Sequence, residues 1–362
     1  MALKEYKCPN CSGPISFNPG TQELTCPYCN SIINIEALNY MDEQTEQTPE
    51  EQAAIWDYDG NSWHEGEEHG LVVYTCNSCS GEIVGDETLG AATCPFCGSP
   101  VVMTAKFAGS LRPDLVIPFK LDKDYALSSL DKHYAKKRLL PDVFKENNHL
   151  EDVKGVYVPF WLYDADTDSH MEYRGTKVRT WSDRNYIYTE TSHFQIIRGG
   201  ALGFDAVPAD GSEKVDDALM ESIEPYNMGD WAGFNTAYLA GFYANKYDKD
   251  AKECSPRANE RIKNTTTAEF RKTVVGYNSV RQVSSNVRIN CGGVRYALFP
   301  VWLLGSTWED KSFIFAMNGQ TGKFVGDLPL DKAKRRRLYW TMFGIIAASL
   351  LAISQAYIAF IM

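Results

Sequence analysis

Hydrophobic and polar residues follow several different patterns along this chain, and the longest apolar run lies at its C-terminal end. Residues 338–362 contain no Asp, Glu, Lys, Arg or His. A helix that crosses the hydrocarbon core of a bilayer needs about 20 such residues. The run therefore predicts a transmembrane tail anchor, rather than a buried core helix, which is usually shorter and has polar residues at both ends.

A basic segment at 331–337 stands directly before this run, with Lys332, Lys334, Arg335, Arg336 and Arg337. Because Lys and Arg accumulate on the cytoplasmic side of a membrane span, we expect residues 1–331 to be cytoplasmic. The first seven residues contain no apolar run that could act as a signal peptide. The prediction is a single-pass protein of the cell membrane with a C-terminal anchor and a cytoplasmic N-terminus.

The apolar tail also carries small residues at every fourth position, namely Gly344, Ala348, Ala352 and Ala356, with Gln355 beside them. Such a ladder lets a second helix approach closely. It favours a homo- or hetero-oligomer through this helix, although random alanine content gives the same spacing.

The central part of the chain, residues 106–330, mixes strand-like and helix-like periods. Alternating or β-branched and aromatic runs predict strands at 111–119, 156–162, 171–181, 186–198, 279–289, 296–304, 311–317 and 323–325, the last two joined by a turn at 318–322. Helical spacing predicts helices at 122–144, 213–223, 234–247 and 250–273, the last with a break at Pro256. We expect an α+β domain with antiparallel sheets and a helical insertion. A Pro-x-Trp match between 156–162 and 296–304 suggests an internal duplication.

The N-terminal part is organised by cysteines. Eight of the ten follow one pattern used twice, Cys-x2-Cys, fourteen residues, Cys-x2-Cys: Cys8, Cys11, Cys26, Cys29, then Cys76, Cys79, Cys94, Cys97. In a reducing compartment such clusters indicate metal binding rather than disulfides. Four thiolates close a tetrahedral shell around Zn²⁺ and leave no open position for catalysis. We predict two β-hairpin-based zinc ribbons, at 1–40 and 71–105, each with one structural Zn²⁺.

Three other interpretations of the cysteines remain. They are iron in a rubredoxin-like site, redox dithiols, and ligands exchanged between the two ribbons. Local pairing closes much shorter loops than exchange does.

Charge bears on what the ribbons bind. Residues 1–105 contain two lysines and no arginine against sixteen Asp and Glu. Nucleic-acid affinity depends largely on Lys and Arg neutralising phosphates, so we expect no nucleic acid as partner and favour protein interaction.

The composition of residues 41–70 predicts an acidic flexible linker with a short helix near 49–56. Its Trp56, Tyr58 and Trp63 either pack on the second ribbon or form a docking motif, while His64 and His69 are not needed as metal ligands.

Several catalytic-looking features are incomplete. Asp164, Asp166 and Asp168 resemble the opening of an EF-hand loop, but Ser169 and Gly175 stand where Gly and Glu are required; a polar turn is expected instead. Cys254 and Cys291 have no His or other base beside them in sequence. We find no active site and predict that the protein is not an enzyme.

A basic cluster on the predicted helix 122–144 either faces anionic lipid or forms a solvated helix face. Its members are Lys132, Lys136, Lys137 and Arg138.

The tandem ribbons, the segments 238–244, 299–304 and 315–323, and the apolar tail together resemble a bacterial family of membrane-anchored zinc-ribbon proteins, of the type labelled after the transcription factor IIB ribbon. The resemblance covers nearly the full chain and implies a non-enzymatic membrane adaptor. It implies as partners the phage-shock-protein-A-like and SPFH-domain proteins of envelope-stress systems, recruited to the inner face of the membrane. The alternative is a membrane-tethered nucleic-acid-binding regulator.

Overall fold

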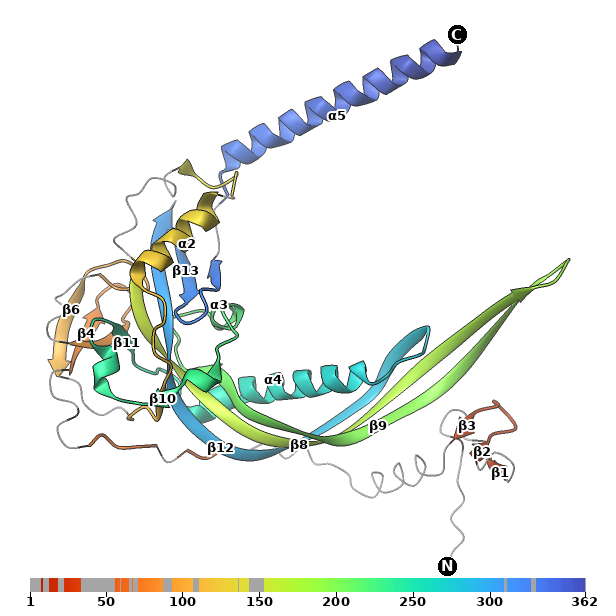
Figure 1. Cartoon of the computed structure of the whole chain (residues 1–362), viewed down its shortest axis with the longest axis horizontal. Coiled ribbons are helices and arrows are strands. Elements are labelled where there is room, and N and C mark those ends of the chain that lie inside the picture. Colours follow the sequence, from red (N-terminus) through yellow and green to blue (C-terminus); the bar gives the residue numbers. More distant parts are fainter. Residues whose placement is uncertain are drawn as a thin grey trace, which may run out of the picture. The chain divides into compact units, whose positions relative to one another are not determined.

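The structure is a computed structural model (Figure 1). It describes residues 8, 13–18, 23–33, 56–58, 60–64, 67, 71–86, 93–106, 111–135, 137–142, 153–308, 311–326 and 330–361. Most of the predicted linker at 41–70, including its short helix near 49–56, lies outside these residues. The chain divides into two compact units built from discontinuous segments: unit 1 comprises 1–58, 162–209 and 251–294, and unit 2 comprises 59–161, 210–250 and 295–362.

The strands form two sheets. The first has three short strands in the order β1 (Ser16–Asn18), β2 (Glu23–Thr25), β3 (Ile32–Ile33). The second has eleven strands and is mixed, because β11 pairs in parallel with β8 and antiparallel with β5. Its main path runs β10-β7-β12-β8-β11-β5-β4-β6, with β9 paired to β8 and β13 and β14 continuing from β12.

Strands β8 (Lys154–Ser182), β9 (Ile187–Asp210) and β12 (Ser279–Trp308) are much longer than the sequence pattern predicts. The predicted strands 156–162 and 171–181 are one continuous strand, and so are 279–289 and 296–304. The intervening Asp164, Asp166 and Asp168 therefore lie within β8, and the predicted polar turn is wrong. The sequence pattern does not show that β8 pairs with β9. The Asp164 carboxylate is also satisfied within unit 1, because it accepts a hydrogen bond from the Ala206 N–H at 2.8 Å.

In unit 1, helix α4 (Ala251–Lys272) covers the long strands. Its buried side chains recur every four residues, at Cys254, Ala258, Ile262, Thr266 and Phe270. Phe270 packs in a core cluster with Met171, Tyr173, Ile196 and Val274.

The helix runs unbroken through Pro256, contrary to the expected break. Proline has no N–H for the Lys252 carbonyl. The Ser255 hydroxyl donates to that carbonyl instead, at 2.8 Å, so the acceptor is not left unsatisfied.

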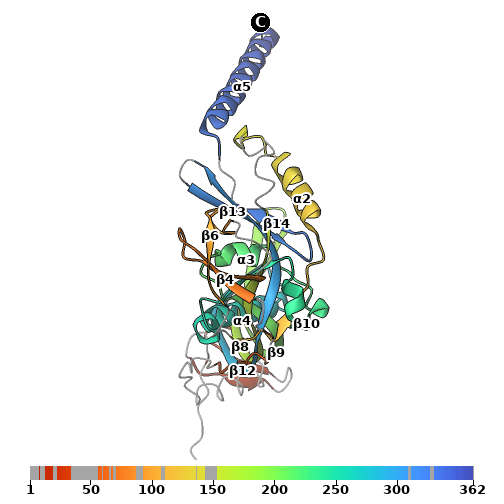
Figure 2. The same cartoon turned by 90° about the vertical axis from the view of Figure 1, so that its left-hand side faces the viewer.

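In unit 2, helix α2 (Lys123–Ala135), shorter than the predicted 122–144, packs against β12 and β13 (Lys311–Asn318) (Figures 1 and 2). The core cluster beneath it contains Ala126, Leu130, Tyr134, Leu140, Val153, Trp302, Leu304, Phe315 and Met317. Phe119 joins two of the segments that carry the family resemblance, because its ring lies 4.2 Å from that of Phe242 and 5.2 Å from that of Trp302.

The predicted helix at 234–247 is wrong. The chain forms a short 3-10 turn, η5 (Thr236–Leu239), and then strand β11 (Tyr243–Asn245). Pairing on both edges of β11 replaces helical hydrogen bonds. The predicted strand at 111–119 is reduced to β7 (Leu115–Val116), and 213–223 forms only α3 (Asp217–Ser222). The remaining small elements of this unit are η4 (Met228–Asp230) and β10 (Ala232–Gly233).

The turn predicted at 318–322 is present between β13 and β14 (Phe324–Gly326). Fully buried Asn318 organises it: the side-chain oxygen accepts the N–H groups of Gln320 and Thr321, both at 2.9 Å. Its side-chain nitrogen donates to the Ile223 carbonyl at 3.0 Å, which fastens the turn to the segment after α3.

The apolar tail is helix α5 (Lys332–Ile361), which includes the predicted basic segment in its first turns. Asp331 begins it, accepting the N–H groups of Ala333 and Lys334 at 2.8 and 3.0 Å. Within the described part of the chain, α5 alone is long and apolar enough to cross a membrane, and its apolar window is not buried.

Candidate metal centres

The second cysteine cluster, Cys76, Cys79, Cys94 and Cys97, brings four sulfur atoms together within 4.8 Å of one another. Cys76 Sγ lies 3.5 Å from Cys97 Sγ, and Cys79 Sγ lies 3.6 Å from Cys94 Sγ. Cys76 ends strand β4 (Leu71–Cys76), and Cys94 and Cys97 precede β6 (Val101–Lys106). Four thiols converging on one point can supply the complete tetrahedral shell of a metal ion such as Zn²⁺.

Each Cys-x2-Cys pair in this cluster is shaped by the same tight turn. The N–H of Cys76 donates to the Gly81 carbonyl and that of Cys94 to the Ser99 carbonyl, at 3.0 and 2.7 Å. The residue after the second cysteine is left-handed, with φ of 55° at Ser80 and 73° at Gly98. This turn directs both thiols of a pair to the same side.

Burial and hydrogen bonding affect the cluster's thiols differently. Burial raises the pKa of the Cys94 and Cys79 thiols. Burial also acts on Cys97, but hydrogen bonds from the Ser99 side chain and backbone lower its pKa to about 7. Because a metal ion binds thiolates, loading this cluster releases protons.

The first cysteine cluster contains Cys8, Cys26 and Cys29 among the described residues; Cys11, the fourth predicted ligand, lies outside them. Cys8 Sγ lies 3.5 Å from Cys29 Sγ. The turn geometry repeats, since Cys26 N–H donates to the Ser31 carbonyl at 2.9 Å and Asn30 has φ of 55°. These residues could hold a metal ion in the same manner.

The two clusters differ in what surrounds them. The first lies with β1, β2 and β3 over a small core of Ile15, Leu24 and Ile33. The second belongs to the eleven-stranded sheet, because β5 (Glu82–Asp86) pairs with β11 through Val84 opposite Ala244. Side chains add to this attachment: Lys214 Nζ donates to the Cys79 carbonyl at 3.2 Å, and Lys246 Nζ lies 3.2 Å from Glu82 Oε2.

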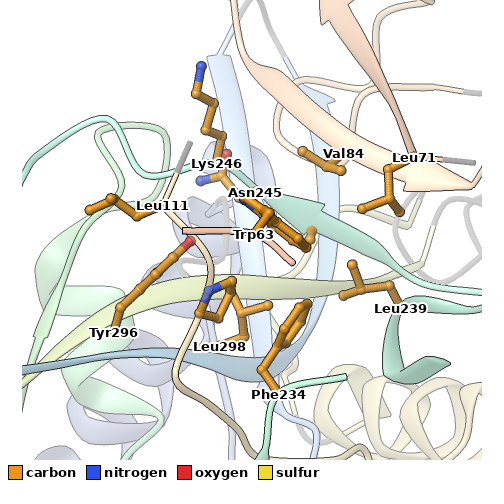
Figure 3. Close-up of a pocket in the computed structure, with 12 residues that line it drawn as sticks. Trp63, Leu71, Val84, Leu111, Phe234, Leu239, Asn245, Lys246, Tyr296 and Leu298 are labelled. Atoms are coloured by element: carbon orange, nitrogen blue, oxygen red, sulfur yellow. The ribbon is translucent and has the colours of Figure 1, made fainter. Parts of the chain in front are cut away.

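An apolar pocket lies beside the second cluster's strands, with about 340 Å³ of empty space, part of it open to solvent (Figure 3). Leu71 and Val84 come from β4 and β5, Ala244 and Asn245 from β11, and Tyr296 and Leu298 from β12. Trp63 and Phe234 complete an aromatic wall, their rings 5.7 Å apart and edge to face. Sequence reasoning did not find this pocket, because its lining comes from segments far apart in the chain.

The other residues considered from the sequence have structural surroundings. Cys254 lies on the buried face of α4. Cys291 is an exposed residue of β12, and partial burial of its thiol, together with the nearby Asp57, raises its pKa. Neither belongs to a metal-ligand group of the described residues, and nor does His64; His69 lies outside them.

Trp56 is buried, but not against the second ribbon as expected. Its Nε1–H donates to Asn259 Oδ1 at 3.0 Å, and its ring packs edge-on against Tyr163 at 4.9 Å. All three residues belong to unit 1. Packing, rather than docking, therefore accounts for this tryptophan.

These features define a chain with two cysteine-based candidate metal centres and one apolar C-terminal helix. It is 34% identical over 329 residues to the uncharacterized protein YdjG of Bacillus subtilis, with 91% of each chain covered. The chain therefore belongs to the same family as YdjG. No family model matches it, and no solved structure matches it.

Proposed function

We propose that this protein is a non-enzymatic adaptor, anchored in the cell membrane by α5, whose two cysteine clusters hold structural Zn²⁺ ions in zinc ribbons. The observation that carries the proposal is the second cluster, in which four thiols converge within 4.8 Å. Four thiolates complete the shell that structural zinc requires and leave no position for substrate or water. The zinc then stabilises a fold rather than performing a reaction.

The anchor supports the choice of location. The unburied apolar window of α5 has the length and composition for a membrane span, and its first turns carry Lys332, Lys334 and Arg335–Arg337. The positive-inside rule then orients the other domains toward the cytoplasm. A protein held there by one helix is suited to collecting partners at the membrane's inner face.

The first cluster supports a role in partner binding. Two apolar side chains of its small sheet are exposed, Phe17 at 46% and Ile32 at 65%, and Tyr28, in the turn between Cys26 and Cys29, is exposed at 74%. Exposed apolar groups gathered on a small rigid module are typical of protein-interaction sites. We propose that a cytosolic protein docks here, of the phage-shock-protein-A-like or SPFH-domain type that the family resemblance implies.

Co-purification from solubilised membranes tests this function. Deleting residues 1–40 removes the first cluster but leaves Trp56 and the large sheet intact. We expect the shortened chain to remain in the membrane fraction and to lose its cytosolic partner, identified by mass spectrometry. Unchanged co-purification would contradict the proposal.

A sharper variant keeps the fold. Tyr28→Ala with Ile32→Asp removes the exposed groups without touching a cysteine, so we expect the partner to be lost while zinc content is unchanged. Tyr125→Ala is the matched control, because this exposed tyrosine lies on α2 of unit 2. Partner loss in the control as well would show that surface tyrosines act non-specifically.

A further inference from the structure

The turn between β8 and β9 carries a concentration of exposed apolar and aromatic side chains. Figure 1 shows this hairpin of unit 1 extending past the ends of α4 and β12. Trp181 is 45% exposed, Tyr186 66%, Ile187 78% and Tyr188 41%. Large apolar side chains grouped at an exposed tip indicate a surface that binds a membrane or another molecule.

Hydrogen bonds from Asp183 and a stacked ring pair order the tip. Asp183 Oδ1 accepts the N–H groups of Asn185 and Tyr186, at 2.9 and 2.8 Å, and Asp183 Oδ2 accepts the Tyr188 hydroxyl at 3.0 Å. The rings of Trp181 and Tyr188 stack with centroids 5.6 Å apart. Such preorganisation lowers the entropy lost on binding.

Charges at the tip are balanced, whereas the chain as a whole has a net charge of −11. Residues 178–190 contain Arg179 and Arg184 against Asp183 and Glu190. The Arg179 guanidinium lies over the Trp181 ring, 5.5 Å from its centroid. Aromatic rings and guanidinium groups are therefore presented together.

We propose that this hairpin tip inserts into the headgroup region of a bilayer and forms a second membrane contact besides α5. Trp and Tyr are the residues that favour the membrane interface, and the balanced charge of the tip does not oppose its approach to lipid headgroups. Ile187 supplies the apolar group that reaches the acyl boundary. The Asp183 carboxylate remains at the polar level, where its three hydrogen bonds satisfy it.

The observations favour lipid over other partners. Nucleic acid would need a continuous basic track, but Asp183 and Glu190 interrupt this one, and Ile187 offers no ring for stacking. A charged protein surface would need a complementary excess of charge, which the balanced tip does not present. The membrane interface accepts exposed Trp and Tyr without such an excess, and the proposed function, on which this inference rests, places the chain at a membrane.

The test uses the full chain in nanodiscs of phosphatidylcholine and phosphatidylglycerol, with and without bromine on the acyl chains. The emission of Trp181 is taken as the difference between the wild type and Trp181→Phe. We expect bromine to reduce that emission at least twofold. Equal emission in both discs, or quenching of Trp181 by a single-stranded oligonucleotide instead, would overturn the proposal.

A pair of aspartate substitutions separates insertion from general proximity. Ile187→Asp should restore most of the Trp181 emission in brominated discs, and Val275→Asp should not, although Val275 is nearly as exposed at 74%. Equal effects of the two would refute specific insertion. Failure of the chain to enter the discs would count against α5 as an anchor, whereas entry without quenching rejects the hairpin contact alone.

Discussion

The two cysteine clusters have the same spacing and the same left-handed turn, yet they are embedded differently. The first belongs to a three-stranded sheet, and the described residues pair no further strand with it. The second belongs to the eleven-stranded sheet, through the pairing of β5 with β11. The same arrangement of thiols should therefore affect stability differently. Metal binding at the second cluster should stabilise the whole of unit 2, whereas metal binding at the first should stabilise only its own small sheet.

The largest test of this contrast is Cys76→Ser against Cys8→Ser. Structural zinc contributes about 10–16 kcal/mol to folding, comparable with the entire stability of a domain. We expect each variant to lose one zinc equivalent by metal analysis. Only Cys76→Ser should remove the main cooperative transition in thermal unfolding. Equal thermal profiles, or full zinc retention in either variant, would contradict the contrast.

Asp210 offers a pH-dependent test of the hydrogen bonds that connect β11 to the segment at 210–212. Its carboxylate accepts the Ser212 N–H at 2.9 Å, and the Ser212 hydroxyl in turn accepts from Asn245 of β11 at 2.5 Å. Burial raises the pKa of Asp210 to about 8; Asp217 and Asp248 also raise it, while the Ser212 N–H and Lys249 lower it.

Because the unfolded pKa is near 3.9, the native state binds more protons between about pH 4 and 8, and the free energy of unfolding falls there by up to about 1.4 kcal/mol per pH unit. Asp210→Asn removes this slope. We expect it to exceed the wild type in stability at pH 8 and to match it near pH 4, as measured by urea unfolding. Asp166→Asn, an exposed carboxylate on β8, should leave the slope in place.

A moderate effect is expected from Asn245→Ala. The change removes a buried hydrogen bond worth about 1–3 kcal/mol at the strand that attaches the second cluster. Zinc should leave the second cluster severalfold faster in chelator, with the first cluster unaffected. Asn235→Ala, an exposed cap of η5, is the control, and identical release rates in both variants would show that β11 does not support the metal site.

The smallest effect belongs to Trp56→Phe. The ring contact with Tyr163 is retained, but the hydrogen bond to Asn259 is lost, at a cost of about 1 kcal/mol. Urea unfolding should detect this change, and neither zinc site should respond. A change in zinc content would show that this segment supports a cluster.

Prediction from sequence succeeded where structure is local. The thiols of the second cluster converge as their spacing indicated, and the predicted α4 and the turn at 318–322 are present, because side-chain periods and turn residues act over a few positions. It failed at 234–247, where aromatic spacing looked helical. There β11 is fixed by partners on β5 and β8, whose positions along the chain lie more than 80 residues away.

The sequence by itself determined the cysteine spacing of two potential metal sites, the apolar C-terminal helix and the acidic character of the N-terminal third. Only the tertiary structure decided that the second cluster is part of the large sheet, that β8 and β12 are continuous, and that aromatic side chains gather at the β8–β9 tip. The physical reason is range. Consecutive residues determine the cysteine spacing and the length of the apolar helix. Strand pairing instead depends on which distant segments satisfy each other's backbone hydrogen-bonding groups.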